Sequence, residues 1–430
     1  MFKGVARVIG VIFVVVLAAS AADAATLKDK LGDLVVNHKR IKAAAAAAEA
    51  AKEQISVAEG AWYPDLAITG NYGYEVQVKG QGTKNTHLPP RELDLSVKQL
   101  LWDFNATNET IGIAELGLKQ ALSVLVATRQ GIILEAVSAH AGLISAIKVL
   151  KFARESEANI KRQTELEDAR VKRGSGLSTD VLQAKTQLAG AQARRVQAEG
   201  ALWTARNRYR AVFGNEPDNM KDLVVPSIPA DMLPMSLDDA VEVARQNNPQ
   251  LKASLIASRI ASRTVNQTRD VTFFPTVNAT ASSKYKEDVA GVIGFKGERK
   301  MMVEFTYNFD LGLTAVNTLN ASRQNALSAE NSFRDARNTV EEQARNAWQN
   351  LLTAKETSSF LANQAVIAEE FLRLARKERK LGKRSLIDVL SGETALINAR
   401  SDATAAETQV VVASFALLGV MGQLETDAIR

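Results

Sequence analysis

The chain has 430 residues, 53 of them basic and 48 acidic, and no cysteine. The lack of cysteine excludes a disulfide framework, a thiolate metal site, a cysteine nucleophile and the acylated cysteine of a lipoprotein. The net charge of +5 is spread along the chain, which argues against the clustered basic surface of a nucleic-acid-binding protein.

An enzyme finds little support in the sequence. Only three histidines occur, His38, His87 and His140, and no metal-ligand spacing joins them. The sequence contains no P-loop, dinucleotide fingerprint or nucleophile elbow. We therefore expect no catalytic residue, no cofactor and no bound metal.

The N-terminus carries the pattern of an exported protein. Lys3 and Arg7 form a basic region, residues 8–18 an apolar core, and residues 22–24 the small-x-small sequence that signal peptidase recognises. An apolar core this short cannot span a bilayer as a helix, for which about 20 residues are needed. We expect a signal peptide over residues 1–24, and no later stretch that is apolar enough for a transmembrane helix.

The placement of the nine prolines predicts very long helices. None lies between Arg91 and Glu216, and none follows Pro275. Proline inside a helix costs about 3 kcal/mol, so proline-free runs of this length are typical of helices. Residues 226–235 hold three prolines and predict a linker, and the capping sequence at 236–239 predicts a helix start directly after it.

The linker separates two halves that repeat each other in order and spacing. Segments 62–64, 99–103 and 173–182 match segments 273–275, 306–310 and 381–390. We therefore predict a first repeat over 25–225, a linker over 226–235 and a second repeat over 236–430. Each repeat should hold one helix of moderate length, two strands and two long helices. The expected helices include 27–61, 105–172, 178–213 and 237–272, and the helix over 105–172 would reach about 100 Å.

Apolar and polar side chains alternate in the strand-like segments. The apolar set occupies alternate positions of 66–78, 93–97 and 301–309, whereas 277–285 alternates more weakly. Segments of about ten residues with this alternation are typical of transmembrane β-strands, although one face of a soluble sheet has the same pattern. The aromatic pairs Trp62-Tyr63 and Phe273-Phe274 stand where a membrane-interface girdle would lie, with core packing as the alternative.

Strands that span the outer membrane would oblige the chain to assemble. Four strands cannot close a membrane barrel, for which about eight is the smallest common number. An open sheet edge in lipid leaves backbone groups unsatisfied, at several kcal/mol each. Several chains must therefore contribute strands to one barrel, but counting strands does not decide whether that barrel contains two, three or four copies.

The order of elements and the turn sequences 173–180 and 381–390 resemble the TolC family of outer-membrane channels. The resemblance implies an α+β fold in which long coiled-coil hairpins form a periplasmic α-barrel. Four transmembrane strands per chain would contribute to a shared 12-stranded β-barrel in a homotrimer. It also implies an outer-membrane protein that extends into the periplasm and docks to a periplasmic adaptor (membrane fusion) protein and an inner-membrane ABC or proton-driven transporter. Such a channel is an exit duct for type I protein secretion or multidrug efflux.

The resemblance also implies roles for residues at the hairpin tips, which close the entrance in that family. Arg384 matches an arginine that bonds to a threonine–aspartate pair, here Thr179 and Asp180. Asp388 matches the first of two ring aspartates that narrow the pore, and Ser391 stands in place of the second, so about half the ring charge is expected. Asp180 and Asp388 could instead be ordinary acidic residues at helix N-termini, where the macrodipole favours them by about 0.3–1 kcal/mol.

One further tip residue departs from the family pattern. Arg379 replaces a latch tyrosine, and it could pair with Asp180 across a subunit interface through a charge-assisted hydrogen bond. The resemblance places adaptor contacts at the turns themselves, on Gly174, Gly176, Leu177, Ser178, Gly382, Lys383 and Ser385.

The competing hypothesis is a periplasmic coiled-coil adaptor or structural spacer. Such a protein would share the export signal, the long helices and the hairpin turns. It would need neither the lipid-facing alternation nor the intact duplication, so recovery in outer-membrane fractions distinguishes the two.

Overall fold

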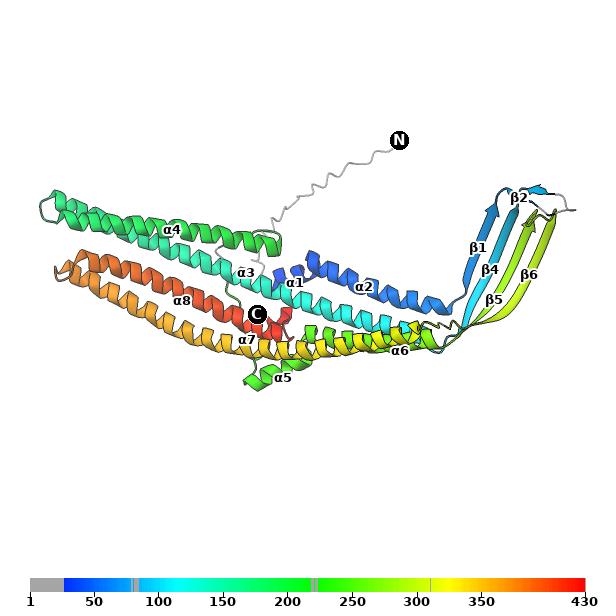
Figure 1. Ribbon diagram of the computed structural model, residues 1–430. Helices are drawn as coiled ribbons and strands as arrows, with labels where there is room; N and C mark the ends of the chain where they lie inside the picture. The colour runs from blue at the N-terminus through cyan, green and yellow to red at the C-terminus, as the bar shows by residue number, and fades with distance from the viewer. Residues whose placement is uncertain are drawn as a thin grey trace, which may run out of the picture.

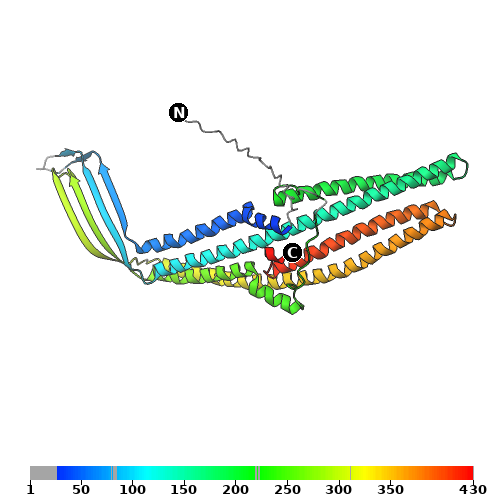
Figure 2. The same cartoon turned by 180° about the vertical axis from the view of Figure 1, so that it is seen from behind.

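The chain folds into an elongated molecule with long helices at one end and a β-sheet at the other (Figure 1). The computed structural model describes residues 27–78, 80, 85–217, 220, 223–309 and 311–429, so the expected signal peptide lies outside the described residues. The C-terminus lies beside the middle of the helical part, where the short helix η2 (Thr426–Ala428) packs against α1 (Leu27–Asn37) (Figure 2).

Four long helices form two hairpins. In the first repeat α3 (Ala106–Lys172) packs against α4 (Ser178–Phe213), and in the second α7 (Thr314–Lys380) packs against α8 (Leu386–Val420). Helices α3 and α7 have 67 residues each, which corresponds to about 100 Å. None of the four contains proline, so the long helices predicted from the proline-free runs are confirmed.

The helix expected at the start of each repeat is broken into two, so the expectation of one continuous helix is wrong in both. The first is α1 followed by α2 (Lys39–Glu59), and the second is α5 (Leu237–Asn247) followed by α6 (Pro249–Phe273). Asn248 precedes a proline, which disfavours helical backbone. Its Oδ1 accepts hydrogen bonds from the backbone N–H groups of Gln250 and Leu251, at 2.9 and 3.0 Å.

The other break and the predicted helix start also have local causes. At the break in the first repeat, Nδ1 of His38 accepts the backbone N–H of Arg40 at 3.2 Å. The helix start predicted at 236–239 is confirmed, because Oγ of Ser236 accepts the N–H of Asp239 at 3.1 Å.

Four antiparallel strands form the main sheet, in the order β1-β4-β5-β6. Their bounds are β1 (Asp65–Tyr72), β4 (Arg91–Trp102), β5 (Thr276–Glu287) and β6 (Phe295–Thr306). The first expected strand, over 66–78, is wrong beyond Tyr72, because the chain turns there into a separate hairpin of β2 (Glu75–Gln77) and β3 (Thr86–Leu88). The last expected strand begins earlier, at Phe295, and ends before Tyr307 and Phe309.

The register gives the sheet two faces of different chemistry. Paired residues of antiparallel strands point to the same side, so the pairs Ile68–Leu95 and Ala281–Met301 share one face. This apolar face consists of Leu66, Ile68, Leu93, Leu95, Val97, Ala279, Ala281, Met301, Val303 and Phe305. The polar face carries Glu92, Asp94, Lys98, Lys284, Lys286, Glu298, Lys300 and Glu304, with ion pairs from Lys284 to Asp94 and from Lys286 to Glu92 at 2.7 and 2.8 Å.

The helices continue the sheet in the same order. Helix α2 leads into β1, β4 into α3, α6 into β5, and β6 into α7 (Figure 1). Next to the sheet, α3 packs against α2 and α6, and α6 packs against α7; farther away, α3 packs against α4 and α8. One chain is therefore a wall with β1, α2 and α4 along one edge, and β6 and α7 along the other, and these edges are uncovered except where α5 packs against α7.

Two helices contain stretches that are long and apolar enough, by length and composition, to cross a bilayer: one in α3 and one in α8. The expectation that no later stretch has such apolarity is therefore wrong. Half of each stretch is buried inside the protein, and residues such as Ile132, Val137, Phe415 and Leu418 form its largest core cluster. The apolarity reflects helices that are covered on more than one face.

Candidate functional site

The two hairpin turns lie at the end of the molecule opposite the sheet (Figure 1), and their backbones have the same cap. In the first, the N–H of Gly174 donates to the carbonyl of Val171 and that of Ser175 to Arg170, at 2.9 and 3.1 Å. In the second, Gly382 donates to Arg379 and Lys383 to Glu378, at 3.0 and 2.9 Å. This is the Schellman arrangement, which needs a residue with positive φ. Gly174 and Gly382 supply it with φ of +77° and +74°.

The helices that follow the turns begin differently. Oγ of Ser385 accepts the N–H of Asp388 at 3.2 Å and caps α8. Leu177 occupies the equivalent position before α4 and has no side-chain oxygen to do the same. Both Asp180 and Asp388 lie in the first turn of their helices, where the macrodipole favours a negative charge. Both aspartates therefore lie at helix starts, and this position is compatible with an additional role in lining a pore.

Arg384 is held by its own repeat. Its Nε donates to Oε2 of Glu378 at 2.6 Å, and its guanidinium lies 5.4 Å from the centre of the Phe371 ring. Asp388 is 4.0 Å from the same guanidinium. Within one chain, the described contacts of Arg384 do not include Thr179 or Asp180, so the expected bond between the two turns stays a prediction about neighbouring copies.

Arg379 joins the two repeats. Its Nη2 lies 3.2 Å from both carboxylate oxygens of Glu167 on α3, and its Nη1 donates to the carbonyl of Arg384 at 3.2 Å. Arg170 also approaches Glu167, at 3.5 Å. Within the chain the partner of Arg379 is therefore Glu167 and not Asp180. Arg379 fixes the backbone of the turn that carries Arg384.

Packing between the hairpins supports this polar link. Ile160, Ala184 and Ala191 from the first hairpin form one core cluster with Leu386 and Leu390 from the second. Within the second hairpin, the buried carboxylate of Glu393 pairs with Arg376.

The outermost surface of the turns is accessible. Leu177 and Leu381 are 66% and 72% exposed, and Ser391, one turn beyond Asp388, is also exposed. The expected adaptor-contact residues include six exposed ones, namely Gly174, Leu177, Ser178, Gly382, Lys383 and Ser385, and one half-buried one, Gly176.

Aromatic side chains gather at the opposite end of the helices, where they meet the sheet. Trp62 is half-buried, and its carbonyl accepts the side-chain amide of Gln99 at 2.8 Å. Phe274 stacks on Phe104 with ring centres 5.0 Å apart, and Trp102 meets Phe104 edge-on at 5.8 Å. Tyr63 is 72% exposed and Phe273 is half-buried. The four residues expected to form the membrane-interface girdle therefore all lie where the helices meet the sheet.

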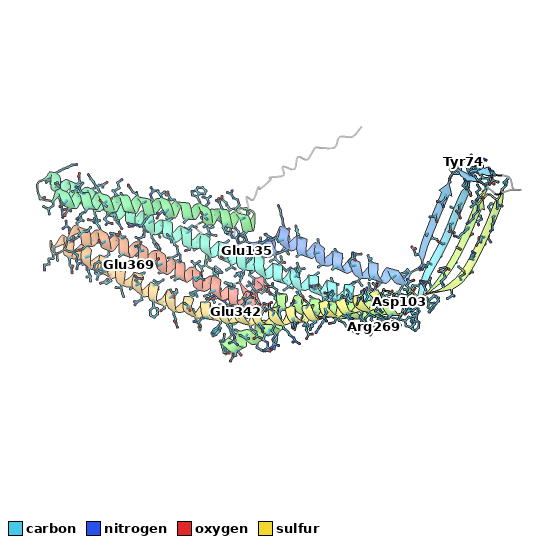
Figure 3. All side chains as sticks on the ribbon, in the orientation of Figure 1. Tyr74, Asp103, Glu135, Arg269, Glu342 and Glu369 are labelled. Atoms are coloured by element: carbon cyan, nitrogen blue, oxygen red, sulfur yellow. The ribbon has the colours of Figure 1, made fainter. Side chains whose placement is uncertain are left out.

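The same level contains the start of α3. Oδ2 of Asp103 accepts the N–H of Thr107 at 2.7 Å, and Figure 3 shows Asp103 at the end of the helices next to the sheet. The sequence repeat matches Asp103 with Asp310, which lies outside the described residues.

Sequence reasoning missed the partners of the tip arginines, namely Glu167, Glu378 and Phe371. Glu378 lies six residues before Arg384 on the other side of the turn, so their ion pair could have been predicted from the sequence of the turn. No sequence signal marks Glu167, because it lies 212 residues from Arg379 and the packing of two hairpins brings it there. Across the part of the chain that the structure describes, no group of three or more His, Asp or Glu side chains could hold a metal ion.

Comparison with known proteins agrees with this architecture. The family model described as outer membrane efflux protein matches residues 31–215 and 240–423. The chain is 26% identical to the outer membrane efflux protein BepC of Brucella suis, over 96% of this chain and 88% of BepC. It is 21% identical to the outer membrane protein TolC of Escherichia coli, over 90% of this chain and 80% of TolC.

Solved structures share the fold. The outer membrane channel CmeC of Campylobacter jejuni superposes with a TM-score of 0.80 at 14% identity, covering 93% of this chain and 86% of CmeC. The family model covers most of both repeats, and the relatives are channels and not enzymes. The chain therefore belongs to the outer membrane efflux protein family, and it is a TolC-like outer-membrane channel that extends into the periplasm.

Proposed function

We propose that three copies of this chain assemble into a channel-tunnel that serves as the exit duct for type I protein secretion or multidrug efflux. The observation that carries the proposal is the four-stranded sheet with one apolar face and two unpaired edges, β1 and β6. An edge exposed to lipid leaves its backbone groups unsatisfied, so β6 of one copy must pair with β1 of the next. Three copies would pool twelve strands, in the size range of membrane barrels.

The uncovered helix edges support the same assembly. Trp203 on α4 is 57% exposed, and Phe360 and Ile367 on α7 are 73% and 60% exposed. Apolar side chains in this number on an edge are typical of an interface that a partner covers. Neighbouring copies that join β6 to β1 would also bring α7 against α2 and α4, because helices and strands follow one order.

The polar face of the sheet would line the water-filled lumen, and the helical tips would form a gate at its periplasmic entrance. The gate residues of this proposal are Arg384 and Arg379, Asp388 and Ser391 at the constriction, and Thr179 and Asp180 of the neighbouring copy. The exposed turn residues would meet a periplasmic adaptor, which connects the channel to an inner-membrane ABC or proton-driven transporter. The channel itself supplies no energy and only exchanges closed and open populations.

The testing experiment measures mass in detergent together with single-channel conductance in a planar bilayer, for wild type and for Asp388→Ala. A trimer with a small, cation-selective conductance that loses its selectivity in the variant is the expected result. A monomer without conductance would overturn the proposal. A conducting trimer whose selectivity is unchanged in the variant would leave the channel but remove Asp388 from the constriction.

A further inference from the structure

The apolar face of the sheet contains one arginine that has no acidic partner among the residues that the structure describes. The register places Arg299 of β6 in a row with Ser283, Leu95 and Ile68. These residues share the side that carries the apolar face, and the Arg299 side chain is exposed. A cation on a lipid-facing surface is costly near the bilayer midplane and close to neutral at the interface. Its position therefore requires an explanation.

The other charges on this side of the sheet are paired with each other. Arg91 and Glu287 occupy the row at the outer end and lie 3.4 Å apart. Tyr285 lies on the same face in the next row, diagonally across from Arg299, and its hydroxyl is near enough to interact with the Arg299 guanidinium. Among the residues that the structure describes, Arg299 forms no ion pair with a carboxylate.

Strand β1 of a neighbouring copy would not supply the missing carboxylate either. In the proposed barrel the strand next to β6 is β1 of another copy. The residues of β1 that point to the apolar side are Leu66, Ile68, Gly70 and Tyr72, and none of them is acidic. The counter-charge of Arg299 must come from outside the strands.

The position of Arg299 along β6 indicates where that counter-charge lies. Arg299 is four residues from Phe295 at the outer end of the strand and six from Phe305 near the helices. At about 3.3 Å per residue these separations are about 13 and 20 Å along the strand. Arg299 is therefore nearer the outer boundary of the membrane, and arginine side chains extend their guanidinium groups toward such boundaries.

The surface beside Arg299 is hollowed. The row next to it, toward the outer end, is Gly70, Leu93, Tyr285 and Gly297, with glycine at both ends. A hollow of about 390 Å³ lies there, lined by Tyr72, Leu93, Tyr285 and Phe295 among others, and also by Arg91 and Glu287, which pair with each other. In Figure 1 this is the end of the sheet away from the helices, and Figure 3 places Tyr74 just beyond it.

We propose that Arg299, together with Tyr285, binds the phosphate of a lipid headgroup in the outer leaflet of the outer membrane. A guanidinium and a phosphate form paired charge-assisted hydrogen bonds, and the Tyr285 hydroxyl adds a donor. The apolar face below the site would lie against the acyl chains. The inference rests on the lipid-facing orientation of this face in the proposed function, and it commits to a lipid and not to a free anion.

The test measures retention of diphosphoryl lipid A by the full-length protein in detergent, using native mass spectrometry. Arg299→Gln should lower the retained lipid about tenfold, because a hydrogen bond to a charged group is lost, and Arg299→Lys should restore part of it. The matched control is Lys300→Gln, which removes the same charge at the next position but on the polar face. That variant should retain lipid as wild type does.

Two further arms identify the ligand. Lipid A without phosphate should be retained weakly by wild type and equally weakly by Arg299→Gln, and an excess of inorganic phosphate should leave the bound lipid in place. Equal retention by wild type and Arg299→Gln, or displacement by inorganic phosphate, would overturn the proposal. Conductance of the same samples distinguishes failure of the lipid site from failure of the proposed channel function. A conducting Arg299→Gln channel with unchanged lipid retention would reject the lipid site and leave the channel proposal intact.

Discussion

Arg379 and Glu167, on helices of different repeats, form a two-point ion pair in which one guanidinium nitrogen lies 3.2 Å from each carboxylate oxygen. The carboxylate is nearly buried, with its side chain 6% exposed, and the arginine is 22% exposed. The second guanidinium nitrogen holds the carbonyl of Arg384. The turn that carries Arg384 is thus tied to the first hairpin of its own chain.

Glu167→Gln should loosen this turn and raise the resting conductance of the channel. Gln keeps the shape but removes the charge, and a hydrogen bond to a charged group contributes about 1.5–3 kcal/mol. A loss of this size would raise the open population about tenfold or more, since about 1.4 kcal/mol is tenfold. Single-channel recording checks it, and Arg379→Ala should act in the same direction.

The control for that prediction is Glu393→Gln. Glu393 is equally buried and pairs with Arg376, but both residues belong to the second hairpin. Loss of the ion pair between Glu393 and Arg376 should lower the thermal stability of the protein without opening the channel. Equal conductance in wild type and Glu167→Gln would mean that the ion pair has no part in gating, and unchanged conductance in Arg379→Ala would remove the latch role from that arginine.

Ser391→Asp should increase cation selectivity. Ser391 is exposed one turn after Asp388, so an added carboxylate there would double the charge that each chain contributes to the proposed constriction. A ring of carboxylates attracts cations and repels anions. Reversal potentials in a salt gradient measure the effect, and Ser391→Asn is the uncharged control. Identical reversal potentials for the Asp and Asn variants would place Ser391 outside the constriction.

The sequence predicted the large features because each has a local signal. Proline-free runs predicted the long helices, and alternation predicted which side chains share the apolar face. The break at Asn248 has a local signal in the following Pro249, which the prediction of one continuous helix did not take into account. The break at His38 has no such marker.

Other features arise only in the folded chain. Alternation continues through Tyr72, Tyr74 and Val76, so the pattern hides the turn into β2 that ends the first strand at Tyr72. The pairing of Arg379 with Glu167 depends on how two hairpins pack, and the resemblance to a family suggested a different partner. The expected domain bounds and the contacts between copies stay predictions.

Gly382→Ala should destabilise the second turn by about 1–2 kcal/mol. The residue has a φ of +74°, where a Cβ meets the following carbonyl. Apart from Gly382 itself and its two chain neighbours, no atom lies within 4 Å of the position that the Cβ would take, so the cost comes from the local backbone and not from a clash with another part of the protein. Thermal unfolding of the detergent-solubilised protein measures it. Gly142→Ala lies inside α3, where no atom outside the adjacent helix backbone comes within 4 Å of the new Cβ, and it should instead be neutral or stabilising.

His140 should make the stability of the helical part depend on pH. Its side chain is 3% exposed on α3, and its Nε2 lies 2.9 Å from the carbonyl of Val224. Burial, with a smaller contribution from Lys30, lowers the pKa of His140 below its ordinary value of 6.5. The unfolded chain therefore binds a proton at a higher pH than the folded chain does, so the stabilising contribution is complete above about pH 6.5 and is lost as pH falls through the folded pKa.

The measurement for His140 is the melting temperature between pH 8 and pH 5, compared with that of His140→Gln. The wild-type value should fall with acidification, with a slope in free energy of up to about 1.4 kcal/mol per pH unit from this residue. The variant should start lower, because it disturbs a buried site, and should show a smaller fall. His38 also has a lowered pKa, through burial and the neighbouring Arg40, so the difference between the two curves isolates His140. Parallel curves would mean that His140 does not titrate with unfolding.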